Sequence, residues 1–151
     1  IYASLFITNK IIFIIKIGVN YLIKRKFNYK SNLAYYEIAE FMIKYINPNS
    51  IIVCIGTDKC VGDCLGPLVG TFLEEHNFPL PVYGTLKDPI HALNLDKKLE
   101  EINKLHPNAC IIGIDACLGD TNSIGEIHTR DYPIHPGKGV GNHYLMLVLP
   151  Q

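Results

Sequence analysis

Two short apolar runs, each followed by an aspartate, constrain the fold of this chain more than any other feature. Residues 51–55 (IIVCI) lead into a glycine-containing loop that ends at Asp63, and residues 109–114 (ACIIGI) lead directly to Asp115. Short, continuously apolar runs are typical of strands buried on both faces of a parallel sheet. Because the carboxyl ends of such strands meet at one edge, where open α/β proteins bind ligands, we predict that the two aspartates lie together there.

Segments with helical periodicity separate these runs. A helix is predicted near residues 32–46, where apolar side chains fall at i, i+3, i+4 and i+7, and another begins near Pro67. Residues 81–84 suit a short edge strand, 90–105 a helix, and 123–129 a last strand before a loop rich in glycine and proline. Strands that alternate with helices indicate a three-layer α/β fold, in which helices cover both faces of a mostly parallel sheet.

The chain divides by charge into two parts. Its 151 residues, 48% hydrophobic and 19% charged, suit one globular domain, predicted to span residues 32–151 and to be incomplete at its C-terminal end. Residues 1–31 form an apolar and basic leader with six Lys and Arg and no acidic residue. The remainder carries eight Lys and Arg against fourteen Asp and Glu, and this negative balance argues against nucleic acid as a partner.

The leader is unsuited to a membrane-spanning helix. Lys10 and Lys16 leave no uncharged run near the roughly 18 residues that a span needs. Three interpretations remain: contact with a membrane surface, supported by the basic residues 24–26; a poor signal sequence, whose charges lie at the wrong end; or an accessory segment that packs poorly.

The five cysteines, an odd number gathered in and beside the two apolar runs, fit a reduced intracellular protein without disulfides. Cys60, Cys64 and Cys117 surround the two aspartates and suggest zinc. No C-x-x-C pair is present, however, so small buried or loop thiols are the favoured interpretation, and neither a metal nor a cofactor is predicted. Hydrolysis through Cys60 or Cys117 with His91 is the least favoured mechanism.

The loop after the first apolar run contains several glycines, which let it bend sharply around Asp58 and Asp63. Gly62 and Gly66 are expected to support the site, although their spacing matches neither the G-x-G-x-x-G fingerprint nor a P-loop. An N-terminal helix cap is the alternative role for Asp63. Asp115 does not suit that role, because a carboxylate directly after an apolar strand must find water, a cation, a hydrogen-bond donor or a shared proton.

Two facing carboxylates can hold one proton between them, since the charge of each raises the pKa of the other. Such a pair provides both an acid and a base for activating water. The segment GTLKDPIHALNL (84–95) adds His91 and Asn94 near the start of its helix, where they can donate hydrogen bonds to a substrate carbonyl. A surface histidine is the alternative for His91, and a flexible turn is the favoured interpretation around Lys138.

Three blocks in order, CIGTDKCVGDCLGPLVG, VYGTLKDPIHALNL and IDACLG, resemble the YyaC-like family of sporulation proteins over residues 32–141. That family is similar to the germination protease of spore-forming bacteria and, more distantly, to the hydrogenase maturation proteases. The resemblance implies a phosphorylase/hydrolase-like fold and peptidase chemistry, with Asp63 and Asp115 at the positions of the germination protease's catalytic pair. The family's sequence continues into a further strand that is not recognisable in residues 143–151.

The leading hypothesis is therefore an atypical aspartic endopeptidase that acts on a protein or peptide in the sporulation programme, in the cytoplasm of the mother cell or forespore. Asp63 and Asp115 would activate water, and the neighbouring residues named above would support them. The alternative is a non-catalytic sporulation factor that uses the same acidic cleft to bind a protein partner or a metal. The substrate and the oligomeric state are left open by the sequence.

Overall fold

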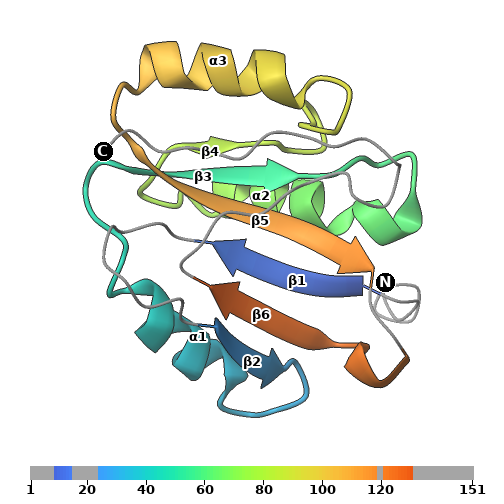
Figure 1. The fold of residues 1–151 in the computed structure, drawn as a ribbon. Helices are drawn as coiled ribbons and strands as arrows, with labels where there is room; N and C mark the ends of the chain where they lie inside the picture. The colour runs from blue at the N-terminus through green and yellow to red at the C-terminus, as the bar shows by residue number, and fades with distance from the viewer. Residues whose placement is uncertain (1–8, 15–23, 119–120, 131–151) are drawn as a thin grey trace.

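The computed structural model describes residues 9–14, 24–118 and 121–130, and these form one six-stranded sheet with helices packed against it (Figure 1). The strands lie in the order β2-β6-β1-β5-β3-β4. The strands are β1 (Asn9–Ile14), β2 (Lys24–Asn28), β3 (Ser50–Ile55), β4 (Val82–Tyr83), β5 (Cys110–Leu118) and β6 (Glu126–Arg130). The helices are α1 (Ala34–Met42), α2 (Leu65–Glu75) and α3 (Leu95–Leu105).

The middle of the chain forms a parallel unit of three strands. β3 pairs in parallel with β4 on one side and with β5 on the other. All six residues of β3 are buried, as expected for a continuously apolar strand covered on both faces. The register sets Ile55, the last residue of β3, opposite Asp115 in β5. The predicted α/β class is thus confirmed.

Two apolar clusters lie on the two faces of this unit. One contains alternate residues of β3, such as Ile51 and Val53, packed with side chains of α3 that include Leu99. The other contains Ile52 and Cys54 together with side chains of α1 and α2. Because successive strand residues point to opposite faces, both faces of β3 are covered, and each large aliphatic side chain buried there contributes about 1.5–3 kcal/mol.

Several element ends differ from those predicted. The helix predicted for 90–105 begins only at Leu95, because residues 91–94 form a turn closed by hydrogen bonds from the Asn94 and Leu95 N–H groups to the His91 carbonyl oxygen. The strand predicted for 123–129 begins at Glu126, after a 3-10 turn.

Part of the basic leader belongs to the sheet. β1 pairs antiparallel with β5 and parallel with β6, and β2 pairs antiparallel with β6. Residues 9–14 and 24–28 of the leader are therefore strands of the same sheet as β3 and β5. Within the described residues, no helix is both long enough and apolar enough to cross a membrane. The predictions for Lys138, the glycine-rich loop and residues 143–151 lie outside the described part of the chain.

Candidate functional site

The chain turns back sharply where β3 ends. Gly56 has φ +146°, and a Cβ atom there would lie 2.0 Å from the backbone oxygen of Asp63. The Thr57 N–H donates to the same Asp63 oxygen at 3.1 Å, and the Gly56 N–H donates to the Ile90 oxygen at 2.7 Å. Only glycine permits this approach, so Gly56 lets the 3-10 turn Val61–Asp63 fold back onto the end of β3.

The helix that follows is packed equally closely. A Cβ atom on Gly66, in the first turn of α2, would lie 2.1 Å from the Ile55 carbonyl oxygen. The N-cap of α2 is Cys64, and no side chain caps the helix. The capping role considered for Asp63 is therefore wrong, and its carboxylate needs another explanation.

The charge of Asp63 affects the protonation of Asp115. Asp115 is half-buried, and its pKa is raised to about 7, first by burial and second by the negative charge of Asp63. A backbone hydrogen bond from Ala116 and the charge of Arg130 act in the opposite direction. The Asp63 pKa is also raised by burial, while a Thr57 backbone hydrogen bond and His91 lower it. The structure thus brings Asp63 and Asp115 to one sheet edge within electrostatic reach of each other.

His91 lies at the same edge. A parallel bridge between Ile55 and Ile90 sets the residue before His91 beside the end of β3. The charge of His91 lowers the Asp63 pKa. Asp63, His91 and Asp115 are therefore gathered beside the carboxyl end of β3. Asp115 was predicted to follow its strand, but it lies within β5, which continues to Leu118 and pairs on its other side with β1.

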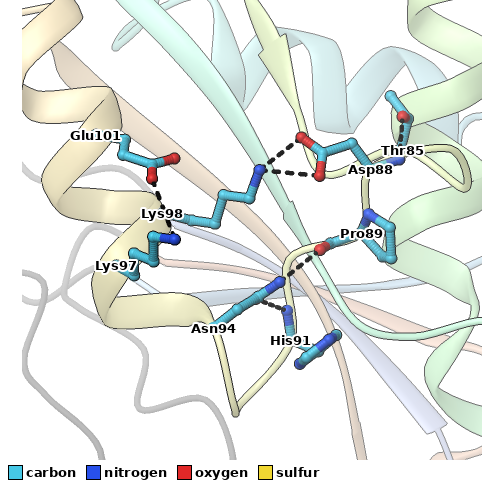
Figure 2. Close-up of polar contacts among 8 residues, drawn as sticks. All are labelled: Thr85, Asp88, Pro89, His91, Asn94, Lys97, Lys98 and Glu101. Carbon is cyan, nitrogen blue, oxygen red and sulfur yellow. Dashed lines mark hydrogen bonds and ion pairs between the residues drawn. The ribbon is translucent and has the colours of Figure 1, made fainter.

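The loop that carries His91 is anchored on both sides. On one side, the Thr71 hydroxyl of α2 accepts a hydrogen bond from the Leu86 N–H at 2.9 Å. On the other, Lys98 of α3 contacts both carboxylate oxygens of Asp88, at 2.9 and 2.7 Å (Figure 2). These contacts hold the loop between two helices.

Asn94 lies beside His91 but uses its side chain within the loop. Its Oδ1 accepts a hydrogen bond from the His91 N–H at 2.8 Å, and its Nδ2 donates to the Pro89 oxygen at 3.0 Å (Figure 2). Asp58 is exposed in the loop before the 3-10 turn, and Gly62 is half-buried within that turn. Substrate contacts by these three residues stay predictions.

The described cysteines, Cys54, Cys60, Cys64 and Cys110, are free thiols. The pKa of Cys64 is raised by burial and then by the charges of Asp58 and Asp63, which disfavours a nucleophilic thiolate. Among the described residues, no three His, Cys, Asp or Glu side chains are grouped so that they could hold a metal ion. The Cys117 side chain lies outside that search.

Sequence reasoning missed Thr57 and Arg130, whereas Gly56 was among the glycines expected to bend the loop after the first apolar run. A glycine directly after a buried strand is typical of a sharp turn with close backbone approach. Arg130 had no such signal in the sequence. Its place depends on register: it pairs with Ile14, which pairs with Gly113, so Arg130 shares a sheet face with Asp115 two residues further along β5.

Most of the chain is similar in sequence to known proteins. A profile described as "Protein of unknown function (DUF1256)" matches residues 26–148. The "Uncharacterized protein YyaC" of Bacillus subtilis (strain 168) is 50% identical over 91 residues, which cover 60% of this chain and 44% of the relative. The chain thus spans less than half the length of that relative. No solved structure gave a significant match.

Proposed function

Because the chain belongs to the DUF1256 family, whose description assigns no activity, we propose from the site itself that it is a peptidase with a two-aspartate centre. The observation that carries this proposal is the meeting of Asp63 and Asp115. Asp115 lies in β5, Asp63 ends the turn that follows the adjacent strand β3, and the charge of Asp63 raises the pKa of Asp115. Pairs of carboxyl groups kept in different protonation states are the usual means by which carboxylates activate water for peptide hydrolysis.

The chemistry assigns a role to each carboxyl group. Asp115, with its pKa near 7, keeps the shared proton and donates a hydrogen bond to the carbonyl oxygen of the scissile peptide. Asp63, as the ionised partner, takes a proton from the attacking water. His91 provides a second donor at the oxyanion. When the tetrahedral intermediate collapses, the C–N bond breaks and the leaving amine receives a proton from the pair.

The resemblance to the germination protease extends this proposal to a protein substrate in sporulating cells, and to a phosphorylase/hydrolase-like fold in the complete protein. We also propose, from this resemblance, that the protein acts in the cytoplasm of the mother cell or forespore. These statements concern the full-length protein, since the chain covers 44% of its curated relative.

The test uses the full-length protein and a protein extract from sporulating Bacillus subtilis. New N-termini are labelled and identified by mass spectrometry. The wild type should generate specific cleavages, while Asp63→Asn and Asp115→Asn should each reduce their rate by at least about 1,000-fold, the loss typical of essential catalytic groups. Asp96→Asn is the matched control, because Asp96 is an exposed carboxylate in the first turn of α3.

The alternative function is non-catalytic binding of a protein partner at the same acidic edge. Two results together would replace the peptidase proposal with this one. The first is that cleavage is absent, or that cleavage persists in both aspartate variants. The second is that one extract protein co-purifies with the wild type and not with Asp63→Asn.

A further inference from the structure

The turn that leads into α3 holds its polar groups in a fixed arrangement. The Asn94 side chain spans the turn, with Oδ1 accepting from the His91 N–H and Nδ2 donating to the Pro89 oxygen. Figure 2 shows the Asn94 side chain inside the turn and the His91 ring extending beyond it. Both polar ends of Asn94 are therefore engaged in shaping the segment that carries His91.

The His91 ring is itself held by this turn. The Leu93 N–H donates to His91 Nδ1 at 3.3 Å. A backbone N–H can only donate, so Nδ1 accepts, and the proton of the neutral imidazole is carried by Nε2. Nε2–H is then the group that His91 can offer to the candidate site, beside which the bridge between Ile55 and Ile90 holds this segment.

We propose that Asn94 is a positioning residue, which fixes the turn so that His91 presents an Nε2–H donor, and not a basic nitrogen, to the pair of aspartates. This inference rests on the proposed peptidase function and deepens it. His91 serves the substrate carbonyl as a hydrogen-bond donor. Asn94, expected from the sequence to contact the substrate, acts through His91 instead.

The same tautomer also bears on the alternative mechanism, in which a cysteine would be the nucleophile and His91 its base. Such a mechanism needs an unprotonated ring nitrogen to accept the thiol proton. The unprotonated nitrogen of His91 is Nδ1, which is occupied by the Leu93 N–H. His91 is thus arranged as a donor and not as a base.

The test observes the tautomer of His91 directly by ¹H–¹⁵N correlation of its ring in the full-length protein, at an alkaline pH where histidines are neutral. The wild type should show one tautomer, with the proton on Nε2. Asn94→Leu, which keeps the size of the side chain but forms no hydrogen bond, should release the turn and give averaged Nδ1 and Nε2 shifts. A proton on Nδ1 in the wild type, or one unaltered tautomer in Asn94→Leu, would overturn the proposal.

Two further variants separate positioning from a general loss of structure. Asn49→Leu removes a comparable contact, since Asn49 Nδ2 donates to the Asn108 oxygen at 2.8 Å in loops that precede β3 and β5. It should leave the His91 tautomer unchanged. Asn94→Asp keeps the acceptor for the His91 N–H and should restore the single Nε2–H tautomer. If Asn94→Asp instead averages the ring shifts, the acceptor is not what positions His91, and the proposal is wrong.

Kinetics provide the second measurement. Asn94→Leu should lower kcat about tenfold and leave KM within about twofold, because it misplaces a donor that acts in the transition state. A rise in KM with unchanged kcat would show that Asn94 binds substrate and would overturn the positioning role. Absence of cleavage by the wild type would refute the peptidase function, whereas the tautomer measurement tests Asn94 without any substrate.

Discussion

Asp115 combines a cost in stability with the catalytic role proposed for it. It follows four buried residues of β5, so its ionised form is both desolvated and close to the charge of Asp63. The same two causes that raise its pKa make the charged form unfavourable for folding. A carboxyl group kept at such a position at the expense of stability is a common feature of functional sites.

The stability of the protein should therefore depend on the protonation of Asp115. Its pKa in the folded state, about 7, lies above the ordinary value of 3.8, so folding favours the protonated form. The stability that the folded protein has while Asp115 is protonated is fully present below about pH 4, and it is lost as the pH rises through 7. Asp115→Asn removes the charge, and should raise the free energy of unfolding by roughly 1–3 kcal/mol at pH 8 and by much less at pH 4.5.

Urea unfolding of the wild type and Asp115→Asn at both pH values measures this difference. Asp96→Asn is again the matched control, because an exposed carboxylate should give nearly the same small change at each pH. A variant that is less stable than the wild type at pH 8 would show that the Asp115 charge is compensated in the folded protein.

At the scale of residues, the sequence predicts which side chains could form a site but not how they are used. Strand pairing sets Asp115 beside the end of β3, whereas Asp63 reaches this edge only through the turn that Gly56 permits. Asn94 could not be assigned in the same way, because its two hydrogen bonds depend on where helix α3 begins. Helical periodicity marks the body of a helix much better than its first turn.

At the scale of elements, β6 contributes a charge to the candidate site although β1 separates it from β5. The side chains of Arg130 and Asp115 share one sheet face, and the positive charge of Arg130 lowers the Asp115 pKa. The apolar runs of β3 and β5 predict their own burial, whereas the alternating pattern of residues 123–129 predicts a strand without naming its neighbours. Strand order is set by contacts distant in sequence, and this is why the influence of Arg130 was not foreseen.

Replacing Arg130 should make Asp115 harder to ionise. Arg130→Gln keeps much of the side chain's length and removes its charge, so the Asp115 pKa should rise further above its usual range. A titration of the Asp115 side-chain carboxyl carbon by NMR measures the shift. Arg25→Gln is the matched control, because Arg25 pairs with Thr129 in β6 and so belongs to the opposite sheet face. An equal shift in both variants would indicate a general charge effect instead of a specific one.

At the scale of the whole molecule, β1 joins two parts of the sheet that differ in how much apolar packing covers them. The parallel unit of β3, β4 and β5 is covered on both faces by the two apolar clusters, to which no described residue of β2 or β6 belongs. β6 is attached to this unit through β1, and β2 is attached through β6. The charge pattern sets the leader apart from the rest of the chain, but charge does not reveal that a leader segment completes a sheet.

A break in β1 should therefore loosen one side of the sheet before the other. Ile12→Pro removes a backbone donor from a strand that has neighbours on both sides, and proline is poorly tolerated there. Hydrogen exchange of the native protein should show amide protection in β2 and β6 falling at least about tenfold more than in β3, since local opening follows the weaker contacts. Ile12→Val keeps every backbone donor and should change neither part. Equal loss of protection in β3 and β6 would mean that the sheet opens as one cooperative unit, and that the candidate site depends on β1 as strongly as on β5.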